Sequence, residues 1–112
     1  MAKPKTRPYS RYGLQAAELL GLLIHDARTA RGLTVAEVAQ RADISRGLVQ
    51  RIESGEMGCS IGAVFEVAAI VGVPLFEPQP STLTRHLETA RSKLILLPKR
   101  VRKSTTVVKD DF

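Results

Sequence analysis

Residues 32–55 read GLTVAEVAQRADISRGLVQRIESG, and the spacing of residues within this stretch predicts two short helices joined by a tight turn. Thr34 is followed three positions later by Glu37. The Thr hydroxyl can accept from the N–H of Glu37 while the Glu carboxylate accepts from the N–H of Thr34, so this pair predicts the capped start of a helix. Asp43 is expected to end that helix in a left-handed conformation, which Asp tolerates better than most residues.

A second helix is predicted to begin after Ser45, to run to about Ser54 and to end at Gly55. At about 100° per residue, its side chains divide into two opposite sides. The apolar side holds Leu48, Val49 and Ile52, and the polar side holds Arg46, Gly47, Gln50 and Arg51. In the major groove of DNA, Arg can bind guanine and Gln can bind adenine through paired hydrogen bonds. The polar side therefore predicts contact with base edges.

Two further helices flank this pair. Between Leu14 and Arg31, before a stop at Gly32, apolar residues recur at three- and four-residue spacing, at Ala17, Leu20, Ile24 and Ala27. Ser60 is predicted to open the other helix, which ends at Gly72 and whose inward residues are Ile61, Val64, Val67, Ala68 and Val71. Four short helices in about sixty residues predict a compact all-α domain.

The charges are distributed unevenly along the 112 residues. Residues 1–13 carry four Lys or Arg and no acid, residues 14–77 carry five against eight acids, and residues 78–112 carry eight against three. The first segment has two prolines and no periodicity, and is predicted to be a disordered basic arm, either a solubilising tail or a phosphate-binding arm. The middle segment is the helical domain, and the last is predicted to be a C-terminal helix with a basic tail.

The order of residues over 20–73 resembles the Cro/C1-type, or XRE-like, helix-turn-helix family. The matching positions are Leu20, Ile24, Arg28, Gly32, Leu33, Thr34, Ala39, Ile44, Ser45, Arg46, Val49, Ile52, Glu53, Gly55, Gly72 and Val73. The resemblance implies that the helix after Ser45 enters the major groove. It implies a buried ion pair between Arg28 and Glu53. The DNA-binding set that it implies is Thr34, Ser45, Arg46, Gly47, Gln50 and Arg51.

Three positions depart from the pattern of the family. Val35 stands where Gln is frequent, which removes one DNA contact, and Asp43 stands where Gly is usual. The loop at 56–59 begins with Glu, whereas this loop is usually basic in the family. Because residues 14–77 are net negative, the two basic arms are expected to supply the cations that contact phosphate.

Within the family, the length, the extended first helix and the tail resemble HipB-like antitoxins. The tail contains residues 97–102, LPKRVR, and ends in Asp110, Asp111 and Phe112. The resemblance implies a repressor that is the antitoxin of a type II toxin–antitoxin operon and that binds a HipA-family kinase-like toxin through these last three residues. The alternatives are a stand-alone phage-type repressor and a module that binds only protein.

After Pro78 and Pro80, Ser81 or Thr82 is predicted to cap a fifth helix. Its apolar seam consists of Leu83, Leu87, Ala90, Leu94 and Leu97. This seam either folds back on the domain or joins two copies. A homodimer is favoured, because symmetric recognition of two half-sites in duplex DNA requires a twofold pair.

Other functions are disfavoured by what the chain lacks. Cys59, His25 and His86 do not have the spacing of a metal site, and the histidines are interpreted as surface residues. No glycine-rich phosphate loop or nucleophile arrangement is present, so we expect no enzyme activity, metal or cofactor. Three Phe, two Tyr and no Trp are too few for a base-stacking platform. No apolar run reaches the roughly 18 residues of a transmembrane helix, and we expect a soluble, cytoplasmic protein without membrane contact.

Overall fold

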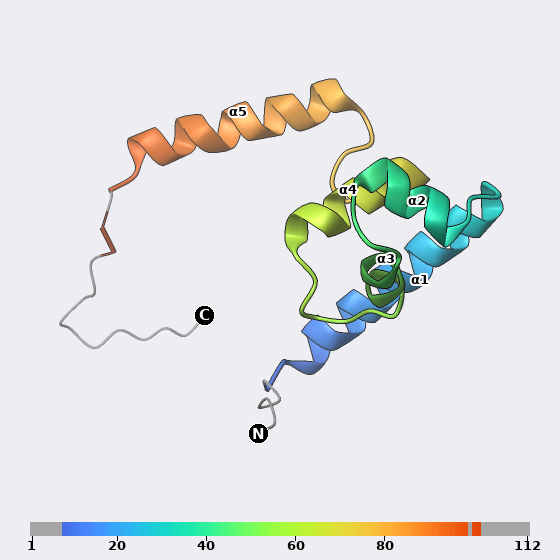
Figure 1. The fold of residues 1–112 in the computed structure, drawn as a ribbon. Coiled ribbons are helices and arrows are strands. Elements are labelled where there is room, and N and C mark those ends of the chain that lie inside the picture. Colours follow the sequence, from blue (N-terminus) through green and yellow to red (C-terminus); the bar gives the residue numbers. More distant parts are fainter. Residues whose placement is uncertain (1–7, 99, 102–112) are drawn as a thin grey trace. The chain divides into compact units, whose positions relative to one another are not determined.

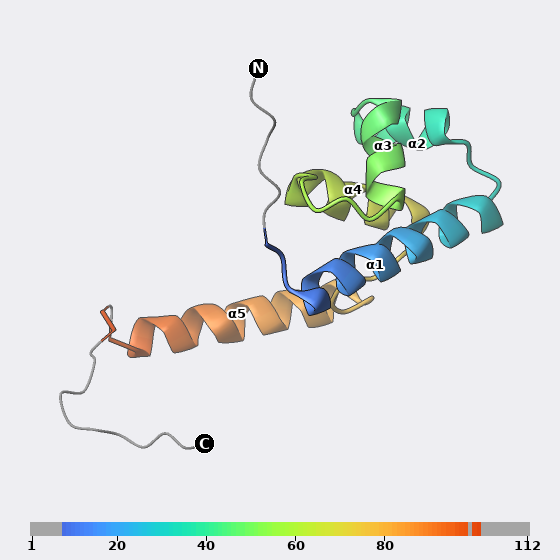
Figure 2. The same ribbon diagram turned by 90° about the horizontal axis from the view of Figure 1, so that it is seen from below.

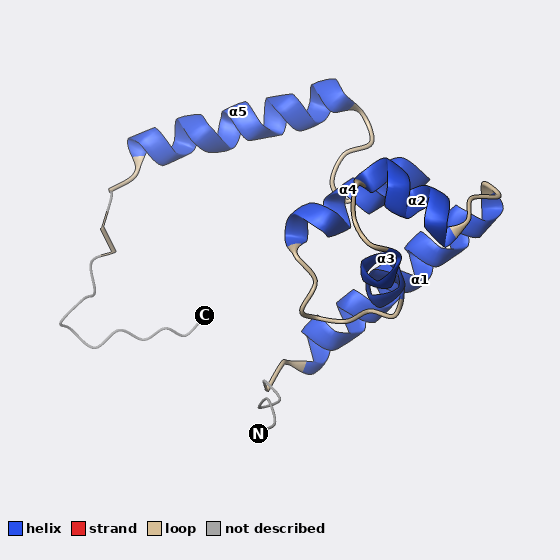
Figure 3. Cartoon of the chain, viewed as in Figure 1, coloured by secondary structure: helices blue, strands red, loops and turns tan. Residues whose placement is uncertain are grey.

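The computed structural model describes residues 8–98, 100 and 101, which form five helices and their connecting loops (Figures 1 and 3). The helices are α1 (Arg11–Ala30), α2 (Val35–Ala42), α3 (Arg46–Glu53), α4 (Ile61–Val71) and α5 (Pro80–Leu96). No strand occurs within the described residues, which confirms the predicted all-α fold. The chain divides into two compact units, Met1–Leu75 with α1 to α4 and Phe76–Phe112 with α5.

The first unit is held together by packing between its four helices. α2 packs against α3 and α4, and α1 packs against the same two helices (Figures 1 and 2). The buried hydrophobic core consists of Ile24, Val38, Ala39, Val49, Ile52, Ala63, Val67, Ala68 and Val71. Full burial of a Val or Ile side chain stabilises a fold by about 1.5–3 kcal/mol. Because all four helices contribute to this core, it fixes α3 against both α1 and α2.

Hydroxyl side chains cap the helices of the first unit. Ser10, Thr34, Ser45 and Ser60 each accept a hydrogen bond from the backbone N–H three residues further on. The capping box at Thr34 is confirmed, and Asp43 ends α2 with a left-handed φ of 58°, as predicted. Each cap satisfies a backbone donor that has no partner inside its helix.

α1 begins at Arg11, ahead of the predicted start at Leu14. The reason is Ser10, whose hydroxyl accepts from the N–H of Gly13 at 3.0 Å. This cap starts the helix in a segment without apolar periodicity. The basic arm predicted for residues 1–13 therefore overlaps the first turn of α1, and its residues 1–7 lie outside the described part of the chain.

The inward side of α4 differs from the prediction at the first residue of the helix. Ile61 was expected in the core, but it is 68% exposed, so this prediction is wrong. Ala63, Val67 and Val71 are buried, and their four-residue spacing places them on one side of α4. Ile61 lies to one side of this stripe, in the first turn.

The second unit contains α5, which begins at Pro80. The predicted cap at Ser81 or Thr82 is wrong, since Gln79 occupies the N-cap position and makes no side-chain capping bond. Pro fits the first helical position because its φ is already helical and the N–H that it lacks would have no partner there. None of the residues of α5 is buried, so the predicted apolar seam is exposed.

Candidate nucleic-acid interface

The turn between α2 and α3 is fixed by backbone and side-chain hydrogen bonds. Asp43 adopts a left-handed conformation, and the N–H of Ile44 donates to the carbonyl oxygen of Ala39 at 3.0 Å. The hydroxyl of Ser45 then accepts from the N–H of Leu48 at 3.0 Å and starts α3. Because Ile44 also packs against the core, these contacts set the direction in which α3 leaves the turn.

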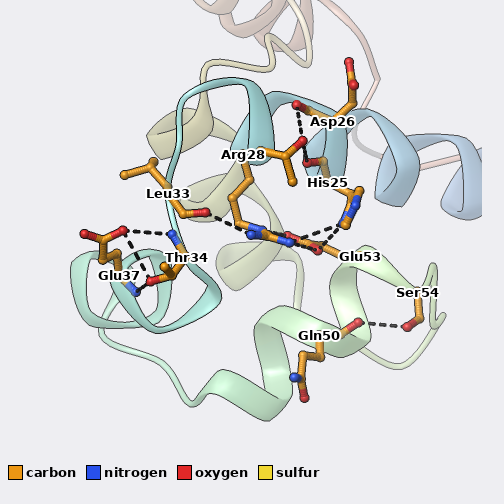
Figure 4. Close-up of polar contacts among 10 residues, drawn as sticks. His25, Asp26, Arg28, Leu33, Thr34, Glu37, Gln50, Glu53 and Ser54 are labelled. Atoms are coloured by element: carbon orange, nitrogen blue, oxygen red, sulfur yellow. Dashed lines mark hydrogen bonds and ion pairs between the residues drawn. The ribbon is translucent and has the colours of Figure 1, made fainter.

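α3 presents a polar side to solvent. Val49 and Ile52 are buried, whereas Arg46, Gln50 and Arg51 are exposed. Figure 4 shows the Gln50 side chain directed away from the polar cluster between α1 and α3. The long polar side chains expected to face DNA are therefore all accessible.

Gly47 lies between these residues on α3. A methyl group added there would meet only Nη1 of Arg51 at 3.7 Å and Oγ of Ser45 at 3.9 Å, which are ordinary van der Waals distances. The fold thus has room for a side chain at this position, although Gly costs a helix about 1 kcal/mol relative to Ala. Close approach of an opposing surface to the backbone would account for the glycine.

Thr34 and Ser45 differ in the hydrogen-bonding capacity that remains after capping. The Thr34 hydroxyl accepts from the N–H of Glu37 at 3.0 Å and donates to its carboxylate at 3.3 Å. Hydrogen bonds from the backbone and the hydroxyl of Thr34 hold the pKa of Glu37 below its usual value. The Ser45 hydroxyl accepts from Leu48, and its own hydrogen can be donated to a phosphate. Of the two residues, Ser45 has the spare donor.

An ion pair connects α1 to the last residue of α3 (Figure 4). Nε and Nη2 of Arg28 donate to the carboxylate of Glu53 at 2.5 and 3.0 Å, and Nη1 donates to the carbonyl oxygen of Leu33 at 2.9 Å. Nδ1 of His25 lies 2.8 Å from Oε1 of Glu53. The side chains of Arg28 and Glu53 are only 11% and 9% exposed, so water and salt screen the pair weakly.

Burial and hydrogen bonding act on Glu53 in opposite directions. Burial alone would raise the pKa of its carboxyl, but hydrogen bonds with Arg28 and His25 outweigh this effect and hold the pKa below 4.5. The hydrogen bond with Glu53 raises the pKa of Arg28 above its already high value. Both partners are therefore charged at neutral pH, and a full ion pair holds the end of α3 against α1.

Two neighbours of the predicted site residues were missed by the sequence analysis. His25 was interpreted as a surface residue and its side chain is 54% exposed, yet it contacts Glu53. Its position three residues before Arg28, on the same side of α1, is the signal that could have revealed this. Arg51 has a neighbour in Glu56, whose Oε1 lies 3.9 Å from Nε of Arg51. Exposed pairs of this kind contribute little to stability.

Several predicted residues lie outside the described part of the chain. They are Asp110, Asp111 and Phe112, which were assigned to a partner, and Lys99, Arg102 and Lys103 of the basic tail. In the part that is described, no group of three or more His, Cys, Asp or Glu residues could hold a metal ion. None of the helices there combines the length and the apolar character that a membrane crossing requires.

The geometry of α2, the turn and α3 agrees with a comparison against protein families. A family model described as a helix-turn-helix domain matches residues 19–77, a range that includes most of α1 and all of α2 to α4. The chain therefore belongs to the helix-turn-helix family, and the predicted fold is confirmed. A search of curated proteins found no match. By class, the protein is a DNA-binding regulator, since helix-turn-helix domains place their second helix in the major groove.

Proposed function

We propose that this protein represses transcription by sequence-specific binding to duplex DNA, with α3 in the major groove. The observation that carries the proposal is the exposed side of α3, where Arg46, Gln50 and Arg51 stand together. The exposed side of a helix usually mixes both signs of charge. Here the only acid of α3, Glu53, is turned toward α1, and the exposed residues match the hydrogen-bonding edges of guanine and adenine.

Contacts with the phosphate backbone come from Ser45 and from the segments that flank the domain. Residues 14–77 carry more acids than bases, so this segment repels DNA at long range. The Lys and Arg residues of segments 1–13 and 78–112 supply the positive charge. Binding that depends on these cations weakens steeply as salt is added, because each neutralised phosphate releases counterions.

Two copies bind the operator as a twofold dimer. The support is the exposed seam of α5, which has the spacing of a coiled coil over Leu83, Leu87, Ala90, Leu94 and Leu97. The titratable side chains that border this seam are His86, Arg91 and Lys93. Arg91 and Lys93 bring only positive charge to the contact with a second α5, so association through this helix strengthens when salt screens the repulsion.

A mobility-shift titration tests the proposal on a duplex enriched from a randomised library. Arg46→Ala and Arg51→Ala are each expected to weaken binding by about 1–3 kcal/mol, or roughly 5- to 150-fold, and to relax the base preference at one position. Arg85→Ala removes one exposed charge from α5 and is the matched control, because it is expected to weaken binding to all duplexes alike and to leave the base preference unchanged. Equal affinity of the parent and both α3 variants for the enriched duplex would contradict the proposal.

We further propose that the repressor is the antitoxin of a HipA-family kinase-like toxin. The support is the resemblance of residues 97–102 and 110–112 to the tail of HipB-like antitoxins. A terminal Phe beside two acids suits an apolar pocket with a basic rim. Deletion of residues 104–112 is expected to reduce co-purification with a HipA-family kinase encoded in the same operon, without changing DNA affinity. Equal retention of the kinase by the shortened chain would contradict the antitoxin role.

A further inference from the structure

The outer side of α1 carries an apolar stripe that does not belong to the core. Tyr12, Ala16, Leu19 and Leu23 recur at spacings of four, three and four residues, which places them on one side of the helix. All four are exposed, and Tyr12, Leu19 and Leu23 are 82%, 57% and 47% exposed. A single exposed Leu is common, but a continuous apolar stripe over three turns marks an interaction surface.

The large and small side chains of this stripe fit against the same stripe of a second copy that runs in the opposite direction. If a second α1 lies antiparallel, with its Ala16 opposite Leu19, then Tyr12 lies opposite the second Leu23. The small Ala16 leaves room for the facing Leu19, so the two helices can approach closely. A twofold contact requires this property, because the same patch must serve both copies.

The charges beside the stripe select the antiparallel orientation. Arg11 at the start of α1 and Asp26 near its end are both exposed and lie on the same side of the stripe. In an antiparallel pair, each Arg11 lies beside the Asp26 of the second copy. In a parallel pair, each Arg11 would lie almost a helix length from the Asp26 of the second copy, so the two could not pair, and the two helix dipoles would repel.

We propose that a second copy of this chain docks antiparallel on the outer side of α1, through Tyr12, Ala16, Leu19 and Leu23. α3 packs on the opposite side of α1, where Gly21 is buried against the backbone of Ile52. The contact therefore leaves the polar side of α3 uncovered, with the two α3 helices on opposite outer sides of the pair.

This arrangement has a consequence that rests on the proposed function. Two copies joined through α1 present their α3 helices to two separate segments of duplex DNA. The two halves of one operator are instead bound by two copies joined through α5. Self-association itself does not depend on DNA. The two proposals can therefore fail independently.

Sedimentation of the full chain without DNA, over a concentration series, tests the contact. Leu19→Asp is expected to weaken association at least tenfold, because it places a charge in the centre of the stripe. Ile61→Asp in α4 introduces the same charge at another exposed apolar residue, which lies outside both the stripe and the seam of α5, and is the matched control. Association through α1 is expected to weaken between about 50 and 500 mM salt, because salt screens the attraction between Arg11 and Asp26. Association through α5 is expected to strengthen over the same range, because there salt screens a repulsion. The association that Leu19→Asp removes should therefore be the part that weakens with salt.

A charge-reversal cycle keeps the test independent of folding. Arg11→Asp and Asp26→Arg are each expected to weaken association several-fold, and the double variant is expected to restore it. Both changes place charges that suit the helix dipole, so neither is expected to unfold α1. A parent that is monomeric at about 100 µM, a Leu19→Asp variant that associates like the parent, or a double variant without recovery would each overturn the proposal. An Arg46→Ala variant that loses DNA binding but sediments like the parent would support the proposal, because the contact through α1 does not involve α3.

Discussion

Gly21 of α1 and Glu53 of α3 lie so close that a methyl group on Gly21 would come within 2.6 Å of the Glu53 carbonyl oxygen. The carbonyl oxygen of Ile52 would lie at 2.7 Å. This close approach of the two backbones brings the Glu53 side chain within reach of Arg28 and His25. The glycine is thus a condition for the ion pair that holds α3.

Gly21→Ala is expected to destabilise the fold by about 1–3 kcal/mol, because the backbone of α3 must move away from the new methyl group. The loss should appear even though Ala favours an isolated helix by about 1 kcal/mol. Urea unfolding measures it. Gly62→Ala in α4, where a methyl group meets nothing within 4 Å, is the control and should not destabilise. Equal effects at both glycines would show that α1 and α3 are not in tight contact.

Glu53→Ala is expected to lower the free energy of unfolding by about 3 kcal/mol, because the charge of Arg28 stays shielded from water and loses its only anionic partner, so that just the Leu33 carbonyl and Nδ1 of His25 remain within hydrogen-bond distance. His25→Ala should cost about 1 kcal/mol or less, since this side chain is half exposed. Thermal and urea unfolding of both variants check the order. A Glu53→Ala variant as stable as the parent would contradict the structural role of the pair.

Stability is expected to fall in acid. Glu53 has a lower pKa in the folded chain than its ordinary value of 4.5, so its contribution is complete above that value and is lost as the pH falls through the folded pKa. Exposed Glu37 shifts in the same direction. Urea unfolding at about pH 6 and about pH 3 should show the loss in the parent and a smaller loss in Glu53→Gln. The same pH dependence in both proteins would argue against Glu53 as its source.

Gly47→Ala separates folding from DNA binding. The free protein should gain up to about 1 kcal/mol, because Ala is the better helix former and the added methyl group meets no close neighbour. DNA affinity should fall if the backbone of α3 approaches the groove at this position. Unfolding and mobility-shift titrations of the same preparation measure both effects. A stabilised variant with undiminished affinity would place the DNA elsewhere.

Removal of residues 1–7 should weaken binding to all duplexes about equally. The deleted segment contains Lys3, Lys5 and Arg7, and each phosphate contact that is lost removes about 0.9 from the slope of log affinity against log salt. The deletion leaves Ser10, so the cap of α1 is preserved. Substitution of the same three residues by Gln is the matched control. An unchanged slope would show that this arm does not touch phosphate.

The boundaries of α2 and α3 could be predicted because their signals are local. Thr34 and Glu37 form the capping box within four residues, and Asp43 and Ser45 act on the backbone beside them. The start of α1 at Ser10 was missed because Ser is common in irregular segments and the apolar stripe begins later. Pro80 was interpreted as a break, although the first position of a helix accommodates Pro as well.

The candidate site could be predicted only in part, because side-chain type is local but tertiary contact is not. Arg46, Gln50 and Arg51 could be assigned to one side of α3 from helical periodicity. The burial of Gly21 depends on where α3 crosses α1, and no spacing within one helix contains that information. A glycine inside an amphipathic helix is the hint of close packing that the sequence carried. The contact of His25 could be inferred only by combining its position three residues before Arg28 with the pairing of Arg28 and Glu53.

The short length of α3 limits how much genetic information one copy can read. From Arg46 to Arg51 the helix axis advances by about 7.5 Å, which corresponds to about two base-pair steps of roughly 3.4 Å and therefore to about three base pairs. Since each base pair has four distinguishable forms in the major groove, a three-base-pair word recurs by chance about once in 64 positions. A single copy therefore cannot select one promoter in a genome, and selectivity requires that several copies bind several such short sites together.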